Sequence, residues 1–390
     1  MFPSMAEPAG RTLGDEEIAA LTRVIRSGML SSVWGTEVRA LEGETADLIG
    51  ARHAVAASSG TAALHLAVAA VAPDPGDEII TTPLSDFGTV APILAQNAVP
   101  VFADVDPLTG NLDVDAVAAA ISPRTRAILA VHLFGAPAPV PALRALADRH
   151  RIALIEDCAQ AWLALGADGR PVGTGGTIGC FSLQQWKHIT CGDGGLAVTD
   201  DARLARAMRL FADKGWPRDT GRHHVSLGLN YRMTELAGAV ARAQLAKLPG
   251  VLAARRRTAR LLIELLAGVP GLHLPDDPDA HAWWLFPMVL TAGHAGEMAT
   301  ALAAERIPAR AGYLAEPLHC APALTENPVY GSSRFPLQVP PASRIPAYGW
   351  GTLPNAERLV RETLVVVDWN EHYTDDHVRH VAAAVRRVTA

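Results

Sequence analysis

Short apolar runs alternate with helical stretches between about residues 50 and 200, and this rhythm predicts an α/β fold. Apolar positions repeated every three or four residues indicate helices, whereas compact apolar runs bounded by turn residues indicate strands. The predicted strands are 53–57, 78–82, 99–105, 127–132 and 152–155. The predicted helices between them are 61–72, 87–97, 113–120 and 142–149. Strands and helices that alternate in this way form a mostly parallel sheet between helices.

The pattern changes between about residues 171 and 200, and a second, smaller region follows over about residues 250–390. Gly-rich turns flank predicted strands at 180–183 and 196–199, and predicted helices follow at 201–212, 234–247 and 255–266. Further elements are predicted at 284–290 (strand), 296–305 (helix), 308–354 (Pro-rich, irregular) and 363–389 (strand, then helix). We expect a flexible tail over residues 1–12, a large domain over 13–250 and a smaller α+β domain over 251–390.

Composition agrees with a large folded core and excludes several classes of protein. Hydrophobic residues make up 49% of the 390 residues and charged residues 19%, so disorder is not expected. A net charge of −6 does not suit a general nucleic-acid binder. The chain also lacks the polybasic segment that is expected in a protein bound to an anionic membrane. Four scattered cysteines without a CxxC pair predict neither a disulfide framework nor a thiolate zinc site. Since MFPSMAEPAGR lacks a signal-peptide pattern, we expect a cytoplasmic protein.

Three short patterns that invite a binding function are set aside. Residues 173–179 (GTGGTIG) have Ile178 where a dinucleotide fingerprint needs its third glycine. Side chains of the neighbours His223 and His224 diverge and have no carboxylate cluster beside them, so we expect a solvated loop and no metal site. The run 255–257, three arginines, is interpreted as a charged helix face rather than a phosphate site.

The segment Ser58-Ser59-Gly60-Thr61 falls between a predicted strand and an Ala/Leu-rich helix. At such a helix start, backbone N–H groups and the helix dipole can hold a phosphate. Gly60 would let a ligand approach the backbone, and Thr61 would add a hydroxyl. The alternative is a simple N-cap, in which Ser or Thr satisfies the helix end. Both interpretations stay open.

Two acids, Glu156 and Asp157, end the apolar strand that begins at Ile152. Ligands in open α/β sheets bind at the carboxyl ends of strands. An unpaired buried charge is costly, so a carboxylate there needs a cationic partner, and a protonated pyridine nitrogen would be one. The alternative is an exposed turn acid.

Lys187 follows an apolar strand and precedes the Gly-rich turn 191–195. A lysine in such a place can lose its proton and form a Schiff base, whereas the alternative is an ordinary surface lysine. Together, the three segments supply what pyridoxal 5′-phosphate requires: a phosphate cradle, an acid for the ring nitrogen and a Schiff-base lysine.

These segments resemble the DegT/StrS family of pyridoxal-phosphate-dependent sugar aminotransferases, which have the aspartate aminotransferase fold (fold type I). Matching stretches run in order over about residues 15–260, and the resemblance thins in the C-terminal region. They include SSGTAALHLA (58–67), IEDCAQA (155–161), IGCFSLQQWKHITCGDGGLAVTDD (178–201) and LNYRMTELAGAVARAQL (229–245). The resemblance implies a mostly parallel seven-stranded sheet between helices in the large domain, plus a smaller C-terminal α+β domain.

The resemblance also implies roles around the cofactor ring. Lys187 would form the Schiff base, and Asp157 would hold the pyridinium nitrogen. Gln160 would contact the ring hydroxyl, and Phe87 matches the aromatic residue that stacks on the ring. Asp157 would keep the ring nitrogen protonated, and Lys187 would move the substrate's Cα proton.

Phosphate contacts are implied for Gly60, Thr61 and Ser182. Asn230 would reach the cofactor phosphate of a neighbouring subunit, which implies a homodimer whose sites are built from both chains. The donor would be L-glutamate or L-glutamine, and the acceptor a keto-sugar or keto-cyclitol. Such chemistry serves amino-sugar and natural-product biosynthesis.

Substrate contacts are less constrained. Arg232, His319 and Trp162 are candidates, and a structural ion pair is an equal alternative for Arg232. Four residues at three places depart from the family pattern: Trp162 with Leu163, Asp86, and Trp186. All should lie near cofactor or substrate, so they affect the substrate assignment more than the cofactor assignment. The acceptor, the position aminated and the stereochemistry stay open.

Two alternative functions remain. Some family members are sugar dehydratases, which carry His in place of the Schiff-base lysine, so Lys187 favours transamination. The second alternative is a non-catalytic, cofactor-binding regulator, which the combination of Lys187, Asp157 and Gln160 disfavours.

Overall fold

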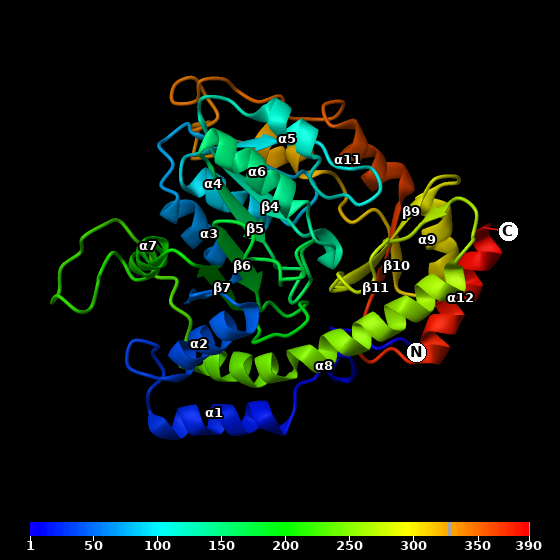
Figure 1. Cartoon of the computed structure of the whole chain (residues 1–390), viewed down its shortest axis with the longest axis horizontal. Coiled ribbons are helices and arrows are strands. Elements are labelled where there is room, and N and C mark those ends of the chain that lie inside the picture. Colours follow the sequence, from blue (N-terminus) through cyan, green and yellow to red (C-terminus); the bar gives the residue numbers. More distant parts are fainter. Residues whose placement is uncertain (327–328, 390) are drawn as a thin grey trace.

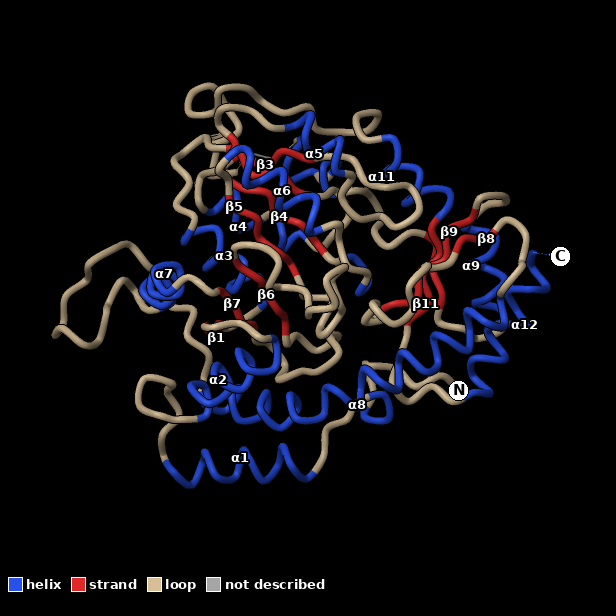
Figure 2. The backbone as a smooth tube through the Cα atoms, viewed as in Figure 1, coloured by secondary structure: helices blue, strands red, loops and turns tan. Residues whose placement is uncertain are grey.

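The computed structural model describes residues 1–326 and 329–389, and two β-sheets organise them (Figures 1 and 2). The larger sheet has seven strands in the order β1-β7-β6-β5-β4-β2-β3. Only β7 runs antiparallel to its neighbours. The α/β prediction is therefore confirmed. The strands are β1 (His53–Ala57), β2 (Glu78–Thr81), β3 (Val99–Phe102), β4 (Thr125–Val131), β5 (Ala153–Asp157), β6 (Ile178–Ser182) and β7 (Gly195–Thr199).

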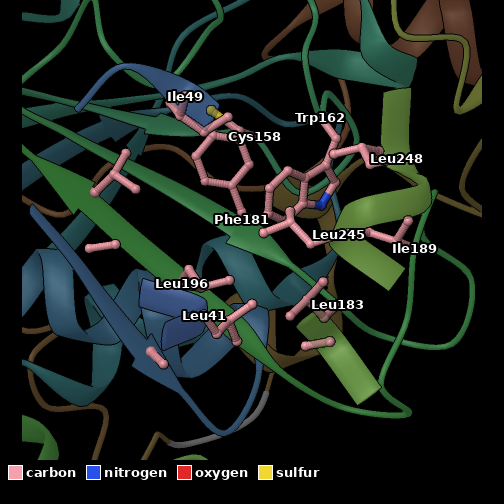
Figure 3. Close-up of a cluster of buried hydrophobic side chains, with 14 of the residues drawn as sticks. Leu41, Ile49, Cys158, Trp162, Phe181, Leu183, Ile189, Leu196, Leu245 and Leu248 are labelled. Carbon is pink, nitrogen blue, oxygen red and sulfur yellow. The ribbon is translucent and has the colours of Figure 1, made fainter. Parts of the chain in front are cut away.

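Helices cover both faces of the larger sheet. Alternate strand residues face α3, α4 and α7 on one side and α2, α5, α6 and the first half of α8 on the other. A cluster on the second side includes Trp162, Phe181 and Leu245 (Figure 3). The helices are α1 (Asp15–Ser27), α2 (Glu37–Ile49), α3 (Gly60–Ala70), α4 (Ala91–Ala95), α5 (Val114–Ala120), α6 (Val140–His150), α7 (Ala202–Ala212) and α8 (Glu235–Leu266).

A four-stranded antiparallel sheet, in the order β10-β11-β9-β8, forms the second region. One face packs on α9, α12 and the end of α8, and the other packs on loops of the larger region. The Pro-rich span is mostly irregular, as predicted, with short elements inside it. The elements are β8 (Leu272–His273), β9 (Leu285–Leu290), α9 (Ala295–Ala304), β10 (Ala309–Ala311), α10 (Pro322–Thr325), α11 (Pro354–Arg358), β11 (Leu364–Asp368) and α12 (Asp375–Thr389).

Helix α8 corrects the prediction of two separate helices at 234–247 and 255–266. It is one helix of 32 residues with Pro249 inside it, and it runs beneath both regions (Figure 1). A proline inside a helix costs about 3 kcal/mol. Burial of Leu245, Leu248 and Leu252, at about 1.5–3 kcal/mol for each side chain, exceeds that cost.

Residues 1–12, expected to be a flexible tail, are packed in part, and we call them the N-terminal strap. Met5, Gly10 and Arg11 are buried. The amide of Asn370 donates to the carbonyl oxygen of Gly10 at 3.0 Å, and Phe2 packs edge-on against Tyr373 at 5.2 Å between ring centroids. The strap therefore lies against the second region, where both chain ends are found (Figure 1).

The segment between α7 and α8 loops outward from the body beside α7 (Figure 1). Its base is tied by Asp213, which accepts hydrogen bonds from Lys214 at 2.9 Å and from Arg218 at 2.6 Å. Val225, Leu227 and Leu229 on this segment are exposed. None of the helices in the described residues has the length and apolar character needed to cross a membrane.

Candidate active site

A pocket of about 510 Å³ lies where the larger sheet meets the second sheet. Strand ends and turns of the larger sheet supply one side, and residues of the second sheet, including Arg310 and Asp368, supply the other. The pocket brings together residues predicted from three separate segments: Gly60, Thr61, Asp157, Ser182 and Lys187.

The turn before α3 supports both interpretations of its sequence. Ser59 is an N-cap, since its hydroxyl accepts a hydrogen bond from the backbone N–H of Ala62 at 3.0 Å. Gly60 begins the helix against the end of β6, where an added Cβ would lie 2.7 Å from the Cβ of Ser182. The first N–H groups of a helix lack intrahelical partners, and Gly60 and Thr61, the first two residues of this helix, line the pocket. The cap therefore leaves an anion cradle beside it.

Strand β5 extends two residues beyond the prediction, so Glu156 and Asp157 lie within the strand and point to opposite faces. Asp157 faces the pocket and is only 4% exposed. Its carboxylate accepts hydrogen bonds from the Thr89 hydroxyl at 2.9 Å and the Ala159 N–H at 3.1 Å. Burial raises the pKa of Asp157, although these hydrogen bonds and the charge of Lys187 oppose the rise. A cation beside this carboxylate would stabilise its ionised form.

Glu156 has a structural role on the other face. Its carboxylate accepts hydrogen bonds from His132 Nε2 at 2.9 Å and from the N–H groups of Gly173 at 2.9 Å and Gly176 at 2.6 Å. Burial acts to raise the pKa of Glu156, but these donors outweigh it and the net shift is downward. Cys158 lies close enough to His132 and Glu156 for a metal cluster. Because protein hydrogen bonds already occupy the carboxylate, we interpret the cluster as structural.

Lys187 lies on the loop between β6 and β7, and its side chain enters the pocket. Its Nζ is 4.2 Å from the centroid of the Trp284 ring, and the Trp284 indole N–H is held by the carbonyl oxygen of Trp186 at 2.7 Å. Burial lowers the pKa of Lys187 to about 8, while the charges of Asp157 and Asp86 act to raise it. An amine with this pKa is present in part as the free base near neutral pH.

The residues present fit pyridoxal phosphate. The start of α3 offers N–H groups for a phosphate, with space that only a glycine at position 60 leaves open. Asp157 is a buried carboxylate aimed at the pocket, as a protonated ring nitrogen requires. Lys187 supplies an amine that can be deprotonated near neutral pH. These three groups are compatible with the phosphate, the ring and the aldehyde of that cofactor.

Three predicted residues lie outside the pocket lining. Phe87 packs into an apolar cluster with Val90 and Leu94, and its neighbour Asp86 enters the pocket instead. Gln160 does not line the pocket itself, but its amide donates a hydrogen bond at 3.2 Å to the hydroxyl of Tyr313, which does. Trp162 is fully buried in the core cluster of Figure 3, so the structure does not bring it to the substrate side.

Trp162 instead holds the backbone at the end of β6, beside the pocket. Its indole N–H donates to the carbonyl oxygen of Ser182 at 2.9 Å, and its ring packs against Phe181 with centroids 4.5 Å apart. This contact gives a physical reason for the tryptophan at position 162, which departs from the family pattern.

Three further candidates lie away from the Lys187 pocket of the same chain. Asn230 is exposed at the base of the outward segment. Arg232 forms an ion pair with Asp213, as the structural alternative expected. His319 is buried, with Nε2 3.2 Å from a carboxylate oxygen of Glu357. Burial lowers the pKa of His319.

Several lining residues were missed in the sequence. Trp284, Tyr313 and Arg310 come from the second sheet and its connections, more than 90 residues from Lys187 along the chain. Met5 comes from the N-terminal strap. No local motif marks these positions, because the fold alone brings them to the pocket.

Comparison with known proteins agrees with this geometry. The DegT/DnrJ/EryC1/StrS aminotransferase family profile matches residues 11–386. An aminotransferase from Psychrobacter cryohalolentis is 28% identical, with a TM-score of 0.84 over 97% of both chains. DesV from S. venezuelae, solved in complex with a ketimine intermediate, is 33% identical, with a TM-score of 0.83 over 96% of this chain and 94% of that one.

A third structure widens the range of chemistry found on this fold. The GDP-4-keto-6-deoxymannose-3-dehydratase ColD has a TM-score of 0.83 over 96% of this chain and 98% of that one. At 24% identity, this similarity shows a common fold alone. The matched profile, the seven-stranded sheet and the pocket at its strand ends lead to one conclusion: the chain belongs to the DegT/DnrJ/EryC1/StrS aminotransferase family and has the fold of type I pyridoxal-phosphate enzymes.

Proposed function

We propose that this protein is a pyridoxal-phosphate-dependent aminotransferase that moves an amino group from L-glutamate or L-glutamine to a keto-sugar or keto-cyclitol. The observation that carries the proposal is the convergence of Lys187, Asp157 and the Gly60-Thr61 turn on one pocket. Amino-sugar or natural-product biosynthesis in the cytoplasm is the corresponding role. Aromatic walls from Trp186, Trp284 and Tyr313 suit the apolar faces of a sugar ring.

Each residue has a task that follows from its surroundings. When bound, the cofactor supplies an electron sink for the electrons left by the departing Cα proton. Asp157 would hold the protonated ring nitrogen, because a buried carboxylate is stabilised by a cation beside it. Lys187, with a pKa of about 8, would accept the Cα proton and deliver it to the cofactor carbon. The Trp284 ring holds the Lys187 amine near that path.

We further propose a homodimer in which the outward segment of each chain completes the partner's site. Support comes from the exposure of Asn230 and of the apolar residues Val225, Leu227 and Leu229, which a monomer would leave in water. Mixing two inactive variants, Lys187→Ala and Asn230→Ala, tests this. Hybrid dimers would contain one intact site and regain activity, whereas sites built within single chains would stay inactive on mixing.

The decisive experiment uses the visible absorbance of the purified protein with pyridoxal phosphate, before and after addition of L-glutamate or L-glutamine. We expect a band that the donor bleaches in wild type and in Lys214→Ala, and no such band in Lys187→Ala. Because the chain has three lysines, borohydride reduction and peptide mapping identify the attachment site among Lys187, Lys214 and Lys247. A band that no amino donor alters would refute transamination.

The dehydratase alternative predicts a different product. With pyridoxal phosphate, glutamate and a keto-sugar, a dehydratase would remove a hydroxyl from the sugar, whereas an aminotransferase would add nitrogen to it. Mass spectrometry of the sugar product distinguishes the two outcomes. Lys187 in the pocket supports transamination.

A further inference from the structure

Side chains from distant elements hold the backbone of the Lys187 loop, residues 183–194. The Trp284 indole N–H donates to the carbonyl oxygen of Trp186 at 2.7 Å. In the next residue, the carbonyl oxygen of Lys187 accepts a hydrogen bond from Arg11 Nη1 at 3.0 Å. Two successive peptide groups at the reactive lysine are therefore fixed from outside the loop.

The burial of Arg11 is difficult to explain by packing alone. Arg11 is only 6% exposed, and its Nε and Nη2 are buried without a hydrogen-bond partner among the described residues. Burial lowers the pKa of Arg11, Glu371 opposes that effect, and Arg255 adds to it. An apolar side chain of similar length would fill the space without the cost of burying a charge. The hydrogen bond to Lys187 is the contact that specifically needs a donor.

Arg11 belongs to the N-terminal strap, which contacts the pocket as well as the second region. The amide of Gln185 donates to the carbonyl oxygen of Met5 at 3.3 Å, and Met5 itself lines the pocket. Met5, Trp186 and Asp368 also line an adjoining cavity of about 150 Å³, so together they separate the two spaces. The amide of Asn370 holds the strap just before Arg11.

We propose that Arg11 is a positioning residue for Lys187, and that the N-terminal strap is a wall of the active site. Arg11 fixes the peptide of Lys187 so that the amine stays beside Trp284 and Asp157. The strap couples the second region to Lys187, because Gly10 binds Asn370 of that region and the next residue, Arg11, binds the carbonyl oxygen of Lys187. The catalytic meaning of this contact rests on the proposed function, whereas the hold on the loop does not.

The test compares Arg11→Met and Arg11→Lys with the matched control Arg257→Met. Arg257 lies on α8, exposed, and forms an ion pair with Asp375, away from the pocket. The first readout is hydrogen–deuterium exchange of the full-length protein with and without pyridoxal phosphate. In Arg11→Met we expect about tenfold faster exchange over residues 183–194, the effect of losing one charge-assisted hydrogen bond, and unchanged exchange in β4. Arg11→Lys should restore part of the protection.

The second readout is the pH dependence of acylation at Lys187 in the cofactor-free protein, measured by peptide mass spectrometry. Wild type should titrate near its pKa of about 8. In Arg11→Met the midpoint should rise toward that of an ordinary lysine, because a looser loop lets the amine reach water. The facing carboxylates Asp157 and Asp86 are unchanged in the variant, and Arg257→Met should match wild type.

Wild-type exchange and a wild-type midpoint in a folded Arg11→Met protein would overturn the proposal and make Arg11 a packing residue. Should circular dichroism find Arg11→Met unfolded, Asn370→Ala decides, because it removes the hydrogen bond that holds the strap just before Arg11. Unchanged exchange over residues 183–194 and an unchanged midpoint in that variant refute positioning, and a shift in both supports it. Failure of the proposed function is visible separately. In that case the wild-type protein would transfer no nitrogen, while the exchange difference between wild type and the Arg11 variants would persist.

Discussion

A methyl group added at Gly60 should damage the cofactor cradle in a way that the structure makes measurable. In Gly60→Ala, the new Cβ would lie 2.7 Å from the Cβ and 2.8 Å from the hydroxyl oxygen of Ser182. Carbon atoms in contact normally lie about 3.5–4.0 Å apart, so the start of α3 and the end of β6 must separate by about 1 Å. The Ser182 Cβ is attached directly to the strand and cannot swing aside.

The loss of stability expected in Gly60→Ala can be separated from the general preference of helices for alanine by comparison with a second glycine. Gly43, in α2, has nothing within 4 Å of an added Cβ. Gly43→Ala should therefore gain about 0.5–1 kcal/mol of stability. In Gly60→Ala the helical gain is smaller, because Gly60 is the first residue of α3, and overpacking costs about 1–3 kcal/mol. The free energy of unfolding of Gly60→Ala should thus lie about 1–3 kcal/mol below that of Gly43→Ala.

Urea unfolding of the cofactor-free proteins measures this difference, and an absorbance titration with pyridoxal phosphate measures the affinity. A displacement of about 1 Å in the cradle should weaken cofactor binding on the order of tenfold or more, while Gly43→Ala should bind as wild type does. The double variant Gly60→Ala/Ser182→Gly removes the obstructing Cβ and should recover stability. Equal stability of Gly60→Ala and Gly43→Ala, with unchanged affinity, would refute the reasoning.

Three further predictions concern charge. Asp86→Asn should lower the pKa of Lys187 below about 8, because the Asp86 charge acts to raise it; an unchanged midpoint in Lys187 acylation would contradict this. Glu156→Gln should cost about 1.5–3 kcal/mol at neutral pH, measured by urea unfolding, because the buried carboxylate accepts three hydrogen bonds. The pKa of Glu156 is lower in the folded than in the unfolded protein. The difference in free energy of unfolding between wild type and Glu156→Gln should therefore be fully present above the unfolded pKa and be lost as the pH falls through the folded pKa. A difference that stays constant with pH would contradict this. Asp213, with a pKa of about 2, forms ion pairs with Lys214, Arg218 and Arg232. Asp213→Asn should therefore speed tryptic cleavage of the outward segment. Equal digestion rates in wild type and variant would show that these ion pairs do not restrain the segment.

The sequence was sufficient for the sheet and for the residues that lie at its strand ends. Carboxyl ends of parallel strands meet at one edge, so a turn at Gly60, an acid at Asp157 and a lysine at Lys187 could be grouped without coordinates. The side each acid faces could not be predicted. A two-residue error at the end of β5 hid the alternation that sends Glu156 to the opposite face.

Other differences arise where tertiary packing decides. Phe87 and Asp86 are neighbours, and the turn between β2 and α4 packs the half-buried aromatic ring against an apolar cluster and places Asp86 in the pocket lining. Helix α8 continues through Pro249, between the two helices predicted at 234–247 and 255–266, because burial of the helix face outweighs the cost of the proline. Trp284 contacts Lys187 from the second sheet. The two residues are 97 positions apart in the chain, and no periodic pattern in the sequence indicates the contact.

Helix α8 has a consequence for how the protein can be divided. Its 32 residues span about 48 Å, and its first half is core to the larger sheet while its last turns are core to the second. The two regions therefore share one helix of their hydrophobic cores and are not independent domains. A chain cut after residue 250 would leave each fragment with a bare apolar stripe, so neither should fold alone. Heat should unfold the intact protein in one cooperative transition, and gene fusions that exchange the C-terminal region should work only when the junction spares this helix.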